Sequence, residues 1–199
     1  MSATTTLAAA RLVDWRFLLP SMELGHVCCG AGSPPEMVHA LAAVSERVTV
    51  VRDPVQWGAV PPASADLVVL VEPSTAELVS AMRSLRPGAS VYLQVRRGAR
   101  GRVGGVTGVV SARRALRRAG MVNPQTYWHA PNFASCARIV PLHQRISVRH
   151  TLMRFDGVRF GRTKSWVGRA LLRGGLFDWG VPCGSVVATC PADRTGSEV

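Results

Sequence analysis

The stretch HVCCGAGSPPEMV, residues 26–38, decides the fold. A short apolar run, residues 26–29, ends at a turn that contains Gly30 and Gly32, which is typical of a buried strand followed by a tight turn. Ser33 as N-cap, Pro34 at the first helical position and Glu36 three residues after Ser33 then form a capping-box pattern. The stretch therefore predicts a strand, a glycine turn and a helix in succession.

The same alternation continues along the chain. The apolar run at 48–52 predicts a second strand, and the run at 66–71 predicts a third, followed by an amphipathic helix over 76–85. Residues 90–95 predict another strand, and after a glycine-rich loop a basic helix is expected over 111–119. Alternating strands and helices predict a doubly wound α/β fold, with a mostly parallel sheet, helices on both faces and a ligand crevice at the carboxyl ends of the strands.

The alternation stops after Gly120. The stretch at 127–133 is aromatic and irregular, and residues 143–182 suggest an insertion or substrate-side segment with one helix. A final apolar run at 184–188 predicts a strand that pairs antiparallel at one edge of the sheet. We expect one domain over residues 14–190, with flexible ends at 1–13 and 191–199.

Composition narrows the class of protein. The chain has 199 residues, 47% of them hydrophobic, which suffices for one substantial core. No apolar run approaches the roughly 20 residues of a membrane-spanning helix, so we expect a cytoplasmic protein without a membrane partner. The five cysteines follow no spacing typical of a zinc site, so no metal is expected.

The formal net charge of +12 comes almost wholly from arginine. Basic residues cluster at 96–102, at 112–118 and between 138 and 173. Such clusters suit an acidic protein, the phosphates of a nucleic acid or a phosphorylated metabolite, but a solvated basic face is the simpler interpretation.

The order of these parts resembles that of the class I S-adenosylmethionine-dependent methyltransferases, which have a Rossmann-like sheet. Their first strand runs into a turn of the type acidic-x-Gly-x-Gly-x-Gly, and here HVCCGAG keeps the last two glycines, with Cys28 in the place of the first and His26 in the place of the acidic residue. LRPGA at 85–89 is similar to the turn before the fifth strand of that family, and RRAGM at 117–121 to the turn before its sixth.

The resemblance implies S-adenosylmethionine as the cofactor, bound near Cys28, Gly30, Gly32 and Asp53, with Glu72 beyond the strand at 66–71. The third strand of the family is lost or reduced to residues 55–57, which leaves Trp57 either stacked on the adenine or packed against the sheet edge. His26 is either a ligand or a core histidine with satisfied nitrogens.

Methyl transfer needs alignment above all, and a base only for a protonated nucleophile. His129 is the candidate base, and Tyr127 and Asn132 are candidates to orient the acceptor; the alternative is a packed aromatic corner with one half-exposed histidine. The sequence thus favours methyl transfer to a small molecule, such as a sugar or a secondary metabolite in biosynthesis. Two alternatives stay open: a methyltransferase-like binding partner with lost or altered catalysis, and an RNA methyltransferase.

Overall fold

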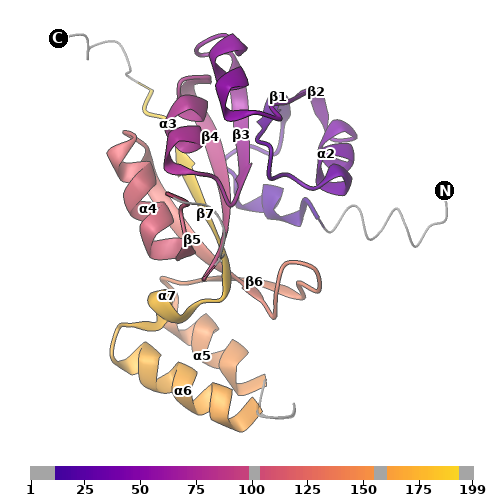
Figure 1. Cartoon of the computed structure of the whole chain (residues 1–199). Coiled ribbons are helices and arrows are strands. Elements are labelled where there is room, and N and C mark those ends of the chain that lie inside the picture. Colours follow the sequence, from indigo (N-terminus) through magenta and orange to yellow (C-terminus); the bar gives the residue numbers. More distant parts are fainter. Residues whose placement is uncertain (1–11, 99–103, 155–160, 193–199) are drawn as a thin grey trace.

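The computed structural model describes residues 12–98, 104–154 and 161–192. Within them, seven strands form one sheet in the order β2-β1-β3-β4-β7-β5-β6 (Figure 1). Strands β1 to β4 are parallel, and β7 is antiparallel to both β4 and β5, so β5 runs in the same direction as β4. The strands are β1 (Leu24–Cys29), β2 (Ser45–Val50), β3 (Ala65–Val71), β4 (Leu85–Arg96), β5 (Val122–Ala130), β6 (Arg138–Pro141) and β7 (Cys183–Thr189).

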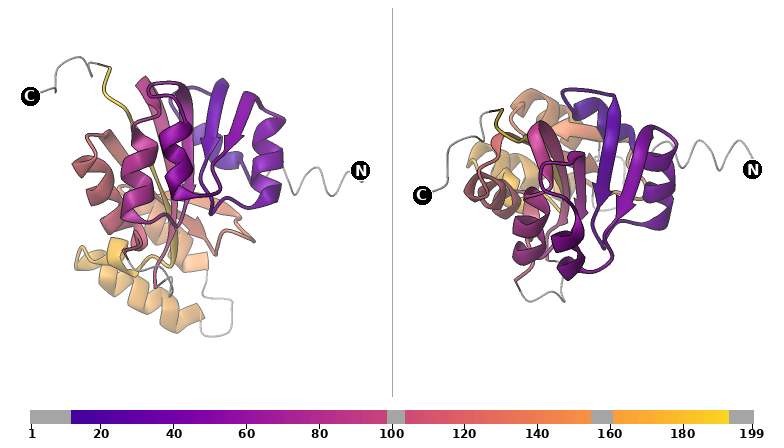
Figure 2. Two further views of the ribbon diagram at one scale, coloured as in Figure 1. Left: turned by 45° about the horizontal axis from the view of Figure 1, so that its top comes forward. Right: turned by 90° about the horizontal axis from the view of Figure 1, so that it is seen from above.

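Helices cover both faces of the sheet, as the two views in Figure 2 show. On one face, the 3-10 helix η1 (Asp14–Leu18) and α2 (Pro35–Ala42) pack in one hydrophobic cluster with Val27, Val69 and Tyr92. On the other, α3 (Thr75–Met82) and α4 (Gly108–Arg118) pack in a second cluster with Val68 and Leu93. The doubly wound α/β fold predicted from the sequence is thereby confirmed.

The predicted strands are present, but β4 begins at Leu85, five residues before the predicted start at 90, because α3 ends at Met82 and not at 85. The C-terminal strand is not at an edge. β7 is antiparallel, as predicted, and it lies between β4 and β5 inside the sheet. All five residues from Gly184 to Ala188 are buried, because helices or neighbouring strands surround the strand on every side. A continuous apolar run such as residues 184–188 is typical of an interior strand. The predicted edge position is therefore wrong.

The region after Gly120 is more regular than its sequence suggests. Residues 127–130 of the aromatic stretch belong to β5, a nine-residue strand, and the short β6 pairs with β5 antiparallel at the sheet edge. The segment expected to contain one helix contains three in its described residues, α5 (Arg145–Met153), α6 (Gly161–Arg173) and α7 (Phe177–Gly180). They lie together at the bottom of Figure 1.

Helix α2 begins one residue later than the capping-box pattern at Ser33 predicts. Pro34 is the N-cap, with φ −60° and ψ 143°, and Pro35 is the first helical residue. A residue that precedes a proline is disfavoured in the helical region, so Pro35 forces Pro34 to be extended. The Ser33 hydroxyl is buried and has no hydrogen-bond partner among the described residues.

The connection from β2 to β3 contains no strand in the described chain. The 3-10 helix η2 (Pro54–Ala59) takes this place and packs against α3. The predicted loss of the family's third strand is therefore confirmed, and β2 becomes the edge of the sheet.

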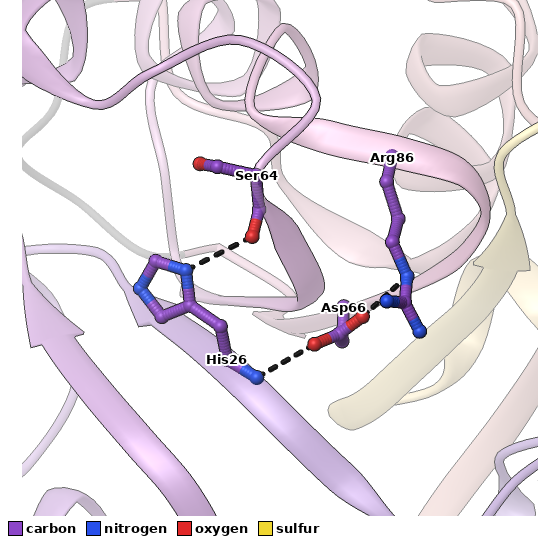
Figure 3. Close-up of polar contacts among 4 residues, drawn as sticks. All are labelled: His26, Ser64, Asp66 and Arg86. Carbon is purple, nitrogen blue, oxygen red and sulfur yellow. Dashed lines mark hydrogen bonds and ion pairs between the residues drawn. The ribbon is translucent and has the colours of Figure 1, made fainter.

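A polar cluster fixes the amino-terminal ends of β1 and β3 (Figure 3). One carboxylate oxygen of Asp66 accepts a hydrogen bond of 2.7 Å from the backbone N–H of His26, and the other forms an ion pair with Arg86. The His26 ring lies with Nδ1 3.0 Å from the Ser64 carbonyl oxygen and Nε2 2.8 Å from Thr49 Oγ1. His26 is thus a structural histidine with both nitrogens satisfied, as the simpler interpretation of the sequence predicts.

Among the described helices, none has both the length and the apolar character needed to span a bilayer. Val13 and Cys190, near the expected domain limits, are packed in the core. Residues 1–11 and 193–199, which contain most of the expected flexible ends, lie outside the described residues, as do residues 99–103 of the glycine-rich loop.

Candidate functional site

Four parallel strands end at the same edge of the sheet, and each is followed by or ends in a residue of the candidate site. Gly30 follows β1, Glu72 follows β3, Arg96 ends β4, and His129 is the penultimate residue of β5. Parallel strands present their carboxyl ends together, which makes this edge the usual ligand crevice of a doubly wound sheet.

A cavity of about 370 Å³ lies at this edge, on the face covered by η1 and α2. Pro34 and Met37, at the start of the helix that follows the glycine turn, form one side of it, and His129 and Phe133 form another. The other lining residues are Leu12, Asp14, Trp15, Tyr92, Gln94, Arg96, Ala134, Cys136, Ala137, Arg138 and Ile139.

Strand β4 supplies the floor of this cavity through its period of two. Tyr92, Gln94 and Arg96 alternate with buried valine and leucine residues and share the face that lines the cavity. Tyr92 stacks on Trp15 of η1, with ring centroids 3.7 Å apart. The sequence at 90–95 predicts a strand, and its polar residues at alternate positions are the signal for this lining.

His129 is the most enclosed of the catalytic candidates. It is 3% exposed, and its Nε2 lies 2.8 Å from the Ser185 hydroxyl on the neighbouring β7. Its Nδ1 lies 3.6 Å from the Cys136 sulfur, and its ring centroid lies 4.7 Å from that of Phe133. Burial lowers the pKa of His129 to about 4. The imidazole is therefore neutral at pH 7 and a weaker base than the sequence suggested.

Arg96 connects the end of β4 to the loop after β3. Its Nε lies 3.1 Å from a carboxylate oxygen of Glu72, and its guanidinium lies 5.7 Å from the centroid of the Phe133 ring. Glu72 adopts a left-handed backbone, φ 49°, which turns its side chain at the strand end. Arg96 and Phe133 were not predicted as site residues, although they link two that were, Glu72 and His129.

The other two catalytic candidates are not among the lining residues of the cavity. Tyr127 is half-buried in β5, and burial raises the pKa of its phenol. Asn132 is exposed, and its Oδ1 accepts a hydrogen bond of 2.9 Å from the backbone N–H of Ser135. The side chain of Asn132 thus stabilises the turn that carries Phe133 toward His129.

The two glycines of the first turn are required by the packing of the chain itself. A Cβ on Gly30 would lie 2.7 Å from both Leu70 Cδ2 and Glu77 Oε1, and a Cβ on Gly32 would collide with the carbonyl oxygen of Val71. The turn therefore lies directly against β3, with its backbone close to the carboxyl end of that strand.

The remaining cofactor candidates differ in accessibility. Asp53 is exposed and caps η2, where its Oδ1 accepts a hydrogen bond of 2.9 Å from the Val55 N–H. Cys28 is fully buried in β1, and burial raises the pKa of its thiol to about 11. Trp57 is 3% exposed and packs in the hydrophobic core. That is the placement expected if the indole fills the core and does not stack on a ligand.

Comparison with known proteins places this arrangement in a structural class. The sequence matches no protein-family profile and no curated protein sequence. The structure is similar to phosphoethanolamine N-methyltransferase 2 of Haemonchus contortus in complex with S-adenosyl-L-methionine, with a TM-score of 0.55 and 12% identity over 91% of this chain and 52% of that one. The chain thus spans about half the length of the Haemonchus enzyme.

Two shorter proteins match over most of both chains. An S-adenosylmethionine-dependent methyltransferase of Archaeoglobus fulgidus has a TM-score of 0.54 and 10% identity over 93% of this chain and 94% of its own. A possible histamine N-methyltransferase of Thermotoga maritima has a TM-score of 0.51 and 11% identity over 92% and 88%. The fold is that of the class I methyltransferases. Strand β4 contains the LRPGA segment that resembles the turn before the fifth strand of these enzymes, and the cavity lies beside the turn that follows β1.

Proposed function

We propose that the chain binds S-adenosylmethionine at the Gly30-Ala31-Gly32 turn and transfers its methyl group to a small molecule in the cavity beside His129. The observation that carries the proposal is that the glycine turn and the cavity beside His129 adjoin each other. Pro34 and Met37 line the cavity, and they follow the glycine turn by only a few residues. A group held at the turn would therefore lie close to an acceptor held in the cavity.

The residues around the turn fit such a cofactor. Ser33 provides a buried hydroxyl that has no partner among the described residues, and a hydrogen bond to a ligand would satisfy it. Asp53 lies three residues after the end of β2 with one carboxylate oxygen engaged in capping η2, and Glu72 directly follows β3. We assign the cofactor contacts to the backbone of the turn, Ser33, Asp53 and Glu72, while the side chains of Cys28 and Trp57 support them from the core.

When bound, S-adenosylmethionine supplies an electrophilic methyl group, so the protein has to align the acceptor and exclude water. The Nε2 atom of neutral His129 is held by Ser185, so its Nδ1, which lies 3.6 Å from the Cys136 sulfur, is the ring atom that would hydrogen-bond an acceptor in place of that weak sulfur contact. Because its pKa is lowered, His129 is suited to orient the acceptor rather than to remove a proton. Arg96, held by Glu72, places a cation beside the same cavity. This arrangement favours an acceptor that needs no strong base.

Isothermal titration of the full chain with S-adenosylmethionine and S-adenosylhomocysteine tests the proposal. We expect saturable binding of both and a rise in melting temperature, because a ligand that prefers the native state stabilises it. Adenosine alone serves as the control for nonspecific binding of the base. No heat and no change in melting temperature at millimolar cofactor would reject the proposal.

A second function is favoured by one observation, the burial of Trp57 in the core. The described chain has no third strand between β2 and β3, and the Trp57 indole, which the sequence offered as a replacement contact for adenine, is packed inside the core. In this alternative the chain is a methyltransferase-fold protein that binds a partner without methyl transfer. The same titration separates the two functions.

A further inference from the structure

A second concave surface lies between α3 and α4, on the face of the sheet opposite the cavity beside His129. This groove has a volume of about 400 Å³. Both helices pack in the cluster that contains Val68 and Leu93, whereas the cavity beside His129 lies with η1 and α2. The groove residues are Thr75, Leu78, Val79, Gly105, Val106, Ser111, Arg114, Ala115, Arg118, Ala119 and Trp179.

The groove is largely aliphatic and aromatic, and two of its apolar side chains are exposed. Val79 of α3 is 56% exposed, and Trp179 of α7 is 53% exposed. Ala115 and Ala119 provide a shallow wall on α4, with Leu78 buried beneath. Adjacent exposed apolar side chains in a concave place are typical of an interaction surface.

The rim of the groove is positively charged. Arg114 and Arg118 line it, and no acidic side chain is among its described lining residues. The spacing of four residues places these two arginines on one side of α4, where they repel each other. Arg113, on the same helix, has Asp178 at 4.0 Å, whereas no acidic partner is seen for Arg114 or Arg118 in the described part of the chain.

Arg114 also determines what kind of partner the groove accepts. Its guanidinium lies 5.3 Å from the centroid of the Trp179 ring, so it covers one face of the indole. A nucleobase could stack only on the other face of the indole, and the aliphatic wall adds little to the binding of phosphates. An amphipathic helix uses both parts of the surface, because its apolar side chains fill the groove and its carboxylates meet the rim.

We propose that the groove between α3 and α4 binds an acidic amphipathic helix of a partner protein. Leu or another large apolar residue of the partner lies against Val79, Ala115 and Trp179, and its carboxylates pair with Arg114 and Arg118. Because the groove and the cavity lie on opposite faces of the sheet, the partner leaves the cavity beside His129 open. The interaction is therefore independent of whether the chain transfers methyl groups.

A pair of labelled peptides of about 18 residues tests the proposal by fluorescence anisotropy with the full chain. One peptide carries leucine on one helical face and glutamate on the flanks, and the other replaces every glutamate with glutamine. We expect saturable binding of the glutamate peptide, weakening at high ionic strength, and at least about tenfold weaker binding of the glutamine peptide. No binding of the glutamate peptide, or equal binding of the two, would overturn the proposal.

Matched variants locate the site. Val79→Glu, and separately the double variant Arg114→Glu/Arg118→Glu, should each weaken binding at least about tenfold. The controls are Val55→Glu, at a side chain that is 83% exposed in η2, and Arg145→Glu/Arg149→Glu, an exposed pair with the same spacing on α5. Circular dichroism verifies that each variant is folded. If the control variants weaken binding as much as the groove variants, the site is elsewhere and the proposal is wrong.

A single-stranded oligoribonucleotide tests the other class of partner. We expect weak binding that the uncharged substitution Val79→Ser leaves unchanged, because an aliphatic wall contributes little to nucleic-acid binding. Tighter binding of the oligoribonucleotide than of the glutamate peptide, lost in Arg114→Glu/Arg118→Glu, would replace the protein partner with a nucleic acid.

Discussion

The Nε2 atom of His129 lies 2.8 Å from the Oγ atom of Ser185, and both side chains are buried. The two residues are 56 positions apart in the sequence, on the adjacent strands β5 and β7. This pair fixes the orientation of the only catalytic candidate from the sequence that lines the cavity. It is also the contact most easily tested by a single substitution.

Ser185→Ala should lower the free energy of unfolding by about 1–3 kcal/mol, because it leaves a buried ring nitrogen without a partner. Urea denaturation at pH 7 measures the change. Ser147→Ala is the control, since that hydroxyl bonds Gln144 at the surface and its loss should cost less than about 0.5 kcal/mol. Equal effects of the two substitutions would show that the His129–Ser185 contact contributes no more to stability than a hydrogen bond at the surface.

The pH dependence of stability should contain the titration of His129. Its pKa is about 4 in the folded protein and 6.5 in the unfolded chain, so between these values the unfolded chain binds more protons. The free energy of unfolding therefore falls as the pH drops from 6.5 to 4, by at most about 3 kcal/mol, and this contribution levels off below pH 4.

Urea midpoints between about pH 4 and pH 7.5 measure this slope. The matched variant His129→Gln keeps a polar side chain that does not titrate, and it should lose the contribution even if it is less stable at every pH. The same slope in both proteins would mean that other groups cause the pH dependence.

Gly32→Ala should destabilise the protein by about 1–3 kcal/mol in the absence of any ligand, because the added Cβ collides with the Val71 carbonyl oxygen. Gly58→Ala is the control, since a Cβ there meets no atom within 4 Å. That change should be neutral or stabilising by about 0.4–1 kcal/mol through the unfolded state. Thermal and urea unfolding of both variants measure the difference. An unchanged free energy of unfolding in Gly32→Ala would mean that the turn is not packed against β3.

Asp53→Ala should weaken binding of S-adenosylmethionine by about 1.5–3 kcal/mol if the carboxylate contacts the cofactor. Asp53→Asn separates this role from the capping of η2, because asparagine keeps the capping oxygen and removes the charge. Isothermal titration of both variants measures the affinity. An affinity that neither change alters would remove Asp53 from the cofactor site.

The regular elements up to α4 could be predicted because their signals are local. The apolar run before Gly30, the Ser74 cap of α3 and the turn at Gly120 each act on their own neighbours. The capping pattern at Ser33 failed by one residue for an equally local reason, since Pro35 restricts the conformation of Pro34.

The sequence by itself determined the alternation of strands and helices and the glycine turn after β1, because periodicity and turn chemistry act over a few residues. Only the tertiary structure decided that β7 enters the sheet between β4 and β5, and with it that Ser185 meets His129. It also decided that Trp57 lies in the core and that Tyr92, Gln94 and Arg96 face a cavity. The physical reason is that strand order depends on which distant segments bury each other's apolar faces, and no short stretch of sequence contains that information.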